Sequence, residues 1–188
     1  MKTVSKTIVL IAAVLIGSAF TTPVKERKEI KESSITWKGK KILGSHEGTI
    51  EMKEGYLEMD GDQLVGGMFV VDMTTIANTD LGDNMKGRLE GHLKSDDFFS
   101  VDKHPTATLV IKKAKKKGNT YATTADLTIK GITKPVNFDL EMGEKGARAG
   151  VKIDRTEYDI KFKSGSFFQN LGDGAISDDF ELDVILKF

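Results

Sequence analysis

The stretch GHLKSDDFFSVDKHPTATL, residues 91–109, decides how the chain is organised, because strand-like sequence lies on both sides of it. It combines acids, histidines, a proline and two adjacent phenylalanines, Phe98 and Phe99. Neighbouring residues on a helix or strand point in different directions, so one face cannot bury both rings. We interpret residues 91–109 as the point where a helical excursion returns the chain to a β-sheet.

A short amphipathic helix is predicted just before the two phenylalanines. Met85, Leu89 and Leu93 recur at the helical spacing of four residues, and Asp83 is a suitable N-cap. Two glycines inside this segment each cost about 1 kcal/mol relative to alanine, so packing must hold the helix in place.

Short runs of alternating apolar and polar residues fill the rest of the chain. Residues 121–129 and 180–186 are clear examples, and glycine-containing turns separate such runs. The run MFVV at residues 68–71 is continuous instead, which predicts a strand covered on both faces. About eight runs of this kind predict an all-β antiparallel sandwich or closed barrel with one helical insertion. Eight antiparallel strands just close around a lumen that can hold one small ligand.

The N-terminus predicts export. Lys2 and Lys6 precede an apolar run at residues 7–16, and small residues follow it. This pattern is typical of a secretory signal peptide over residues 1–19, with an uncleaved N-terminal anchor as the alternative. The apolar run is shorter than the roughly 20 residues that span a bilayer, so we expect no membrane span after cleavage. Residues 20–33 are polar and are expected to be a flexible tether, leaving residues 34–188 as one barrel domain.

The composition excludes several functional classes. Lys and Arg number 28, as do Asp and Glu, so no nucleic-acid partner is indicated. The absence of cysteine excludes disulfides, thiolate catalysis and cysteine-ligated metals. The oligomeric state is left open.

No enzyme chemistry is predicted. His46, His92 and His104 match no metal-ligand spacing, so no metal site is expected. Asp96 and Asp97 are neighbours that point apart and suit helix capping better than paired acid–base work. Nucleophile-elbow, metalloprotease and phosphate-loop motifs are absent, so no catalytic residue is assigned. A hydrolase or lyase that uses His92, Asp96 and Asp97 is the weaker alternative.

Several segments together resemble the YceI-like family. HLKSDDFFSVDKHPTATL is followed by DLTIKGITKPVNF, GTIEMKEG and GGMFVVDMTTI precede them, and VKIDRTEYDIKF comes later. The resemblance covers residues 33–188. It implies an eight-stranded, lipocalin-like antiparallel β-barrel with an apolar lumen. It also implies binding of a polyisoprenoid, an isoprenoid quinone-like lipid or a similar amphiphilic lipid in the periplasm or outside the cell, with no other cofactor.

The residues leave open whether the apolar side chains line a cavity or fill a solid core. Flexible methionines suit an irregular lumen, and the resemblance to the YceI-like family favours the cavity. The candidates for the lumen and its lid are Trp37, Met52, Met59, Met68, Val70, Met73, Leu89, His92, Leu93, Phe98, Phe99, Leu127, Phe138, Leu140, Phe167 and Phe168. His92 and Arg155 are head-group candidates, although a structural pair with a carboxylate across the sheet is the favoured interpretation of Arg155. The expected function is to sequester or carry the lipid without catalysis. The alternative is a solidly packed structural or interaction module that binds a protein partner.

Overall fold

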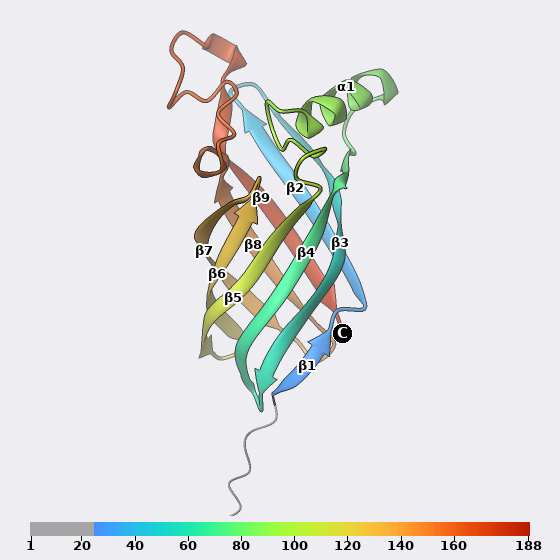
Figure 1. Ribbon diagram of the computed structural model, residues 1–188, viewed down its shortest axis with the longest axis vertical. Helices are drawn as coiled ribbons and strands as arrows, with labels where there is room; N and C mark the ends of the chain where they lie inside the picture. The colour runs from blue at the N-terminus through green and yellow to red at the C-terminus, as the bar shows by residue number, and fades with distance from the viewer. Residues whose placement is uncertain (1–24) are drawn as a thin grey trace, which may run out of the picture.

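The computed structural model describes residues 25–188, and this part of the chain forms a closed β-barrel with one helix at its end (Figure 1). The predicted signal peptide and residues 20–24 lie outside the described residues. The strands are β1 (Glu26–Glu29), β2 (Glu32–Lys41), β3 (Ser45–Asp60), β4 (Gln63–Asn78), β5 (Thr106–Lys117), β6 (Thr120–Ile129), β7 (Ile132–Met142), β8 (Gly146–Asp154) and β9 (Ile176–Lys187). The helix α1 spans Asp83–Lys94, and the short 3-10 helices η1 (Arg155–Tyr158) and η2 (Gly172–Gly174) precede β9.

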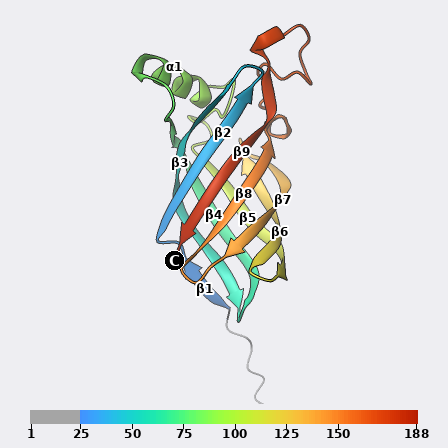
Figure 2. The same ribbon diagram turned by 180° about the vertical axis from the view of Figure 1, so that it is seen from behind.

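The barrel closes because β3 pairs with β2, at one end of the strand order, and also with β4, at the other end. Within residues 25–188 the strands follow the order β3-β2-β9-β8-β7-β6-β5-β4, and β4 pairs with β3 again. Every pairing between these strands is antiparallel. Figure 2 shows β2, β9 and β8 side by side on the rear wall. The prediction of an eight-stranded antiparallel barrel with a helical insertion is confirmed, and the barrel replaces the sandwich as the outcome of the alternation.

The segment expected to be a flexible tether forms strand structure from residue 26 onward. Glu26 pairs with Met59 and Glu29 with Tyr56, so β1 extends the sheet alongside β3. The Arg27 guanidinium lies 3.4 Å from the centroid of the Tyr56 ring. The tether prediction is wrong for residues 26–33 because it rested on side-chain polarity. These polar side chains do face solvent, but the backbone beneath them is paired.

The two ends of the barrel differ. At one end, Asp60 pairs with Gln63 across a two-residue turn, where Gly61 takes a φ of +55° that glycine adopts without strain. The Tyr121 hydroxyl donates to the carbonyl oxygen of Asp62, and Gln63 Nε2 donates to that of Ala114 at 3.0 Å. These bonds close this end. The opposite end carries α1, the β2–β3 turn and the loop that contains η2 (Figures 1 and 2).

Helix α1 forms where the apolar spacing predicts it, but it packs less completely. Leu93 is buried and Leu89 is half-buried, whereas Met85 is exposed at the start of the helix. Gly82 is the N-cap and offers no side chain, so the prediction of Asp83 as the cap is wrong by one position. The Glu90 carboxylate accepts a hydrogen bond from the Asn78 backbone N–H at 2.8 Å, which joins the helix to the end of β4.

Strand β4 is covered on one face only. Phe69 and Met73 are buried on the inner side, whereas Met68 and Val70 are half-buried on the outer side of the barrel. There they face the side chains of neighbouring strands, such as exposed Val110, which pairs with Met68. The prediction from the MFVV run is therefore wrong: the outer face of β4 is apolar without a second layer over it.

Candidate functional site

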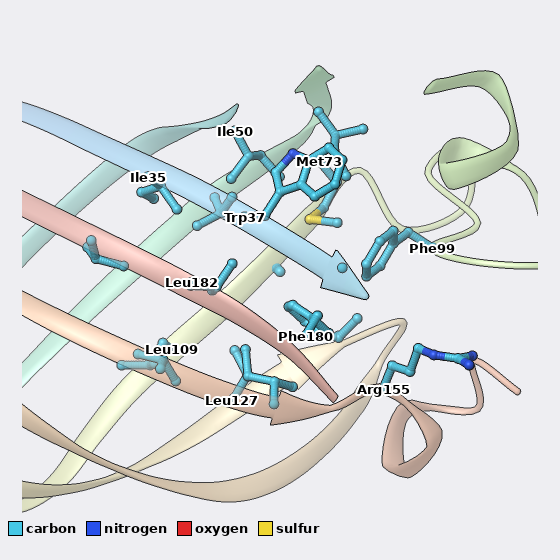
Figure 3. Close-up of a pocket in the computed structure, with 18 of the residues that line it drawn as sticks. Ile35, Trp37, Ile50, Met73, Phe99, Leu109, Leu127, Arg155, Phe180 and Leu182 are labelled. Atoms are coloured by element: carbon cyan, nitrogen blue, oxygen red, sulfur yellow. The ribbon is translucent and has the colours of Figure 1, made fainter. Parts of the chain in front are cut away.

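The barrel encloses an elongated apolar cavity of about 310 Å³, open at the end that carries α1. This volume lies at the lower end of the roughly 300–1,000 Å³ typical of small-molecule sites. All eight barrel strands contribute side chains, and Figure 3 shows ten of the residues labelled. The apolar strand residues around it are Ile35, Trp37, Ile50, Met52, Phe69, Val71, Met73, Ile76, Ala107, Leu109, Ile111, Leu127, Ile129, Phe138, Leu140, Ala149, Val151, Ile153, Ile176, Phe180, Leu182, Val184 and Leu186.

The cavity is long as well as apolar. Its lining on β9 extends from Ile176 at the mouth to Leu186. At about 3.3 Å per residue and a strand tilt of about 40°, this corresponds to roughly 25 Å along the barrel axis. A cavity of this shape suits a chain-like ligand better than a compact one.

Trp37 seals a gap in the wall between β3 and β4. Thr49 pairs with Ala77, but the next paired residue on β3, Glu51, meets Asp72, so residues 73–76 leave the regular ladder. The Trp37 indole N–H donates to the carbonyl oxygens of Thr49 and Ala77, both at 3.2 Å. It thereby satisfies carbonyl groups at the point where the ladder is interrupted.

A glycine makes room for this indole. A Cβ atom on Gly48 would lie 2.6 Å from Trp37 Cζ2 and 1.9 Å from the Ala77 carbonyl oxygen. The ring is therefore held between β2 and the β3–β4 seam while it lines the lumen. Because Trp37 is the chain's single tryptophan and lines the lumen, tryptophan fluorescence reports on this one position of the lumen wall.

The two adjacent phenylalanines face different partners, and both line the cavity. The Phe98 ring packs edge-on against His92 at 4.9 Å between centroids, and it lies 5.5 Å from Phe162. The Phe99 ring meets Phe180 edge-to-face at 6.3 Å, across the mouth (Figure 3). We call α1 and the segment between it and β5, residues 83–105, the lid. Phe98 anchors the lid to the barrel rim, and Phe99 is the part of the lid that covers the lumen.

Polar groups surround the mouth. Lys40, Lys41 and His46 line it on the β2–β3 side, and Ser177 and Asp179 line it on the β9 side. Lys40 Nζ lies 2.5 Å from Glu181 Oε1, and Lys152 Nζ lies 2.7 Å from Asp179 Oδ2. An apolar tube with a charged rim fits an amphiphile whose polar end remains near water.

A hydrogen-bond network ties this rim to the lid. His46 Nδ1 lies 3.0 Å from Asp80 Oδ2, and the buried Asn78 amide donates to Asp80 and to the Glu47 carbonyl oxygen. Burial acts to raise the pKa of Asp80, but hydrogen bonds from Asn78 and His46 outweigh it, and the pKa is lowered. The Asp80 carboxylate is therefore favoured in its charged form beside the start of α1.

Arg155 is buried beneath the loop that precedes β9, with 4 % of its surface exposed. Its guanidinium donates to the carbonyl oxygens of Ile160 at 2.7 Å, Ser177 at 2.8 Å and Ile176 at 3.0 Å. Asp178 lies 3.6 Å away, as a carboxylate partner across the fold. Figure 3 shows the guanidinium directed away from Phe180 and Leu127. This geometry is that of a structural tie, although part of the side chain borders the cavity.

His92 and the two neighbouring acids lie outside the cavity. His92 Nε2 is 3.1 Å from Asp97 Oδ2, and its ring contacts Phe162 at 4.6 Å. Asp96 accepts a hydrogen bond from Lys103 at 2.7 Å, which with the Ser100 hydroxyl lowers the pKa of Asp96. These carboxylates are exposed and do not line the lumen cavity. Over residues 25–188, no cluster of three potential metal ligands occurs.

The structure brings most of the predicted lumen residues together. Those that line the cavity are Trp37, Met52, Met73, Leu89, Leu93, Phe98, Phe99, Leu127, Phe138, Leu140 and, from the head-group candidates, Arg155. Those that do not are Met59, Met68, Val70, His92, Phe167 and Phe168.

The misplaced residues have identifiable causes. Met59 is buried at the closed end, where it pairs with Leu64 beyond the cavity. Met68 and Val70 belong to the outer face of β4, because a continuous apolar run does not reveal which alternate residues point inward. Phe167 and Phe168 lie in the loop before η2 with half of their surface exposed.

Some lining residues were not among the sequence candidates. Phe180, Leu182 and Val184 on β9 could have been included, because their alternation already predicted a shared face. Phe69 and Val71 required the correct choice of face on β4. The polar rim, with Lys41 and His46, had no signal beyond a glycine-flanked turn.

No helix within the described part of the chain is both long enough and apolar enough to span a bilayer.

Comparison with known proteins agrees with this geometry. The model of the YceI-like domain matches residues 28–188. A UPF0312 protein of Pectobacterium atrosepticum is 34 % identical over 116 residues, which are 58 % of each chain, so the match spans less than two thirds of that relative. BcnA of Burkholderia cenocepacia superposes with a TM-score of 0.64 and 20 % identity, over 82 % of this chain and 94 % of BcnA. A polyisoprenoid-binding domain from Saccharophagus degradans superposes with a TM-score of 0.57 and 14 % identity, over 84 % and 95 %. At these identities, the structural matches establish the shared fold.

Proposed function

The chain belongs to the YceI-like domain family, and we propose that it is an exported carrier that holds a polyisoprenoid or similar amphiphilic lipid in its barrel lumen without acting on it chemically. The observation that carries the proposal is the long apolar cavity, which is closed at one end and has a polar rim at the other.

The energetics of such a cavity suit an isoprenoid tail. Each CH₂ group moved from water into an apolar site contributes about 0.8 kcal/mol. A tail that buries about ten such groups gains about 8 kcal/mol before the entropic costs of binding are subtracted, and each further buried group adds to this gain. No charged contact inside the lumen is needed. The binding of polyisoprenoid by the Saccharophagus domain, which has the same fold, favours this class of tail among amphiphiles.

The polar end of the lipid would lie at the rim. Lys41 and His46 border the cavity there, and they replace His92 and Arg155 as our head-group candidates. His92 faces away from the lumen, and three donors of the Arg155 guanidinium are committed to backbone carbonyls. Export to the periplasm or beyond rests on the signal-peptide pattern of residues 1–19.

The competing proposal of a structural module required a solidly packed barrel. A cavity of about 310 Å³ does not fit that requirement, since protein interiors otherwise leave few voids larger than a water molecule. The proposed absence of catalysis is supported by the lining, because the carboxylates and histidines that could act as acid or base lie at the rim or outside the barrel.

Fluorescence of Trp37 tests this proposal. Titration with a brominated long-chain alcohol, a contact quencher, is expected to quench Trp37 to saturation with a one-to-one endpoint. Farnesol should then restore the emission by competing for the lumen. Absence of quenching up to the solubility limit of the alcohol, with folded protein, would contradict a lumen that admits a lipid tail.

A further inference from the structure

Exposed apolar side chains gather around the lumen mouth. Of the seven large exposed apolar residues in the described part of the chain, Ile42, Leu43, Met85, Phe167 and Phe168 lie on the three segments at this end. The β2–β3 turn, α1 and the η2 loop all project from the same end of the barrel (Figures 1 and 2). The other two, Val110 and Ile185, lie on strands of the wall.

Two of these segments meet at a residue of the mouth itself. Ile176 lines the cavity, pairs with Lys41 on one side and forms a bridge with Ser164 on the other. Ile42 follows Lys41 directly, and its N–H donates to the Ala175 carbonyl oxygen at 3.3 Å. The backbone N–H groups of Phe167 and Phe168 both donate to the Ser164 carbonyl oxygen. The four side chains of Ile42, Leu43, Phe167 and Phe168, which we call the mouth pad, therefore adjoin the lumen opening.

Lysines accompany the mouth pad. The Lys161 ammonium lies 5.1 Å from the Phe167 ring centroid, although it is also paired with Asp159 at 2.8 Å. Lys41 and Lys163 form no ion pair with any residue between 25 and 188. Aromatic and aliphatic tips flanked by lysines are the pattern with which proteins bind the interface of an anionic membrane.

The area of the mouth pad argues against a second copy of the chain as its occupant. Phe167 and Phe168 are 52 % and 50 % exposed, which leaves roughly 100 Å² of each ring side chain in water. With two aliphatic side chains added, this falls well short of the roughly 800 Å² per partner of a stable interface. A bilayer needs no such area, because shallow insertion of a few tips is reinforced by attraction of lysines to anionic lipid.

We propose that the mouth pad docks this protein on an anionic phospholipid bilayer with the lumen opening toward the lipid. The inference that a ligand then passes between bilayer and lumen rests on the proposed function; the docking itself does not. A tail that passes directly from the bilayer into a docked mouth does not enter water. The free-energy cost of exposing each CH₂ group to water is thereby avoided.

Vesicle co-sedimentation tests the docking. Vesicles of phosphatidylcholine and phosphatidylglycerol are compared with vesicles of phosphatidylcholine alone. The double variant Phe167→Ser/Phe168→Ser is expected to lower the partition coefficient at least about tenfold. Val110→Ser/Ile185→Ser, which removes equal numbers of exposed apolar side chains from the wall, should leave it unchanged. Lys41→Gln/Lys163→Gln should remove most of the preference for the anionic vesicles.

The outcomes separate the two proposals. Equal sedimentation of the two serine double variants, or no sedimentation of the unaltered protein, would overturn the docking. So would a concentration-dependent dimer in analytical ultracentrifugation that the Phe167→Ser/Phe168→Ser change abolishes. Because all variants share residues 1–24, any contribution of that segment cancels. Trp37 quenching in the absence of vesicles should be the same for the two serine double variants and the unaltered protein. Absence of quenching in the unaltered protein would count against the proposed function while leaving the docking intact.

Discussion

Filling the deep half of the lumen should abolish most lipid binding. Ala149 lies in an inward row with Val184 and Ile35 across β8, β9 and β2. The next row toward the mouth contains Val151, Leu182 and Trp37. All six residues line the cavity, so the ring introduced by Ala149→Phe must occupy space one row deeper than the tryptophan.

The magnitude follows from the volume that the ring removes. A phenyl group displaces about four CH₂ groups of the tail, which at about 0.8 kcal/mol each amounts to about 3 kcal/mol. This corresponds to a rise of about 200-fold in Kd. The fold should tolerate the ring, because the space that it enters is cavity, whereas overpacking of a dense core costs about 1–3 kcal/mol.

The assay is the Trp37 quenching titration, since Ala149→Phe preserves the single tryptophan. The matched control is Val110→Phe, on the outer face of β5, which should change the Kd by less than about twofold. An unchanged Kd in a folded Ala149→Phe protein would show that the tail does not reach the deep half of the lumen. Equal weakening by both variants would show that binding occurs elsewhere.

Three further predictions concern stability. Gly48→Ala should lower the free energy of unfolding by about 2–3 kcal/mol, because the added Cβ meets the Ala77 carbonyl and the Trp37 ring. The control Gly150→Ala has open space around its Cβ and should change stability by less than about 1 kcal/mol. Equal urea midpoints for the two variants would refute the seam geometry. Arg155→Met should lower the free energy of unfolding by about 3–5 kcal/mol in the same assay, because three carbonyls and Asp178 lose their partner. Arg155→Lys should recover only part of this loss. A loss below about 1 kcal/mol in Arg155→Met would contradict a structural tie. Asp80→Asn should cost about 1 kcal/mol at neutral pH. The folded-state pKa of Asp80 is lowered, so its contribution to stability is present above the ordinary aspartate pKa and is lost as the pH falls through the lowered value. The difference in unfolding free energy from the unaltered protein should therefore narrow as the pH is taken below the ordinary aspartate pKa, and a difference that stays constant would contradict the assignment.

The sequence determined the barrel well because alternation is a local signal. On β6, Tyr121, Ala125 and Leu127 are buried, as their spacing predicts. The same rule failed on β4, where Met68 to Val71 are all apolar and both choices of inner face look alike. Only the pairing of Phe69 with Leu109, which also lines the lumen, resolves the choice.

The lid was predictable in outline and the rim was not. The adjacency of Phe98 and Phe99 required two different apolar receivers, and the structure supplies Phe162 and Phe180. The position of Arg155 depends on carbonyls up to 22 residues away, in a loop whose path no local pattern predicts. Phe167 and Phe168 were assigned to the lumen because they are aromatic. Exposed aromatic residues at an interaction surface look the same in the sequence, so the pattern could not separate the two positions.

The central claim, that the lumen carries a lipid, is tested most directly by native mass spectrometry of the protein purified without detergent from its own host. The account predicts a bound species with the mass of an isoprenoid lipid, retained by Val110→Phe and lost from Ala149→Phe. A mass equal to the bare polypeptide in the unaltered protein, together with no uptake of added farnesol, would contradict it.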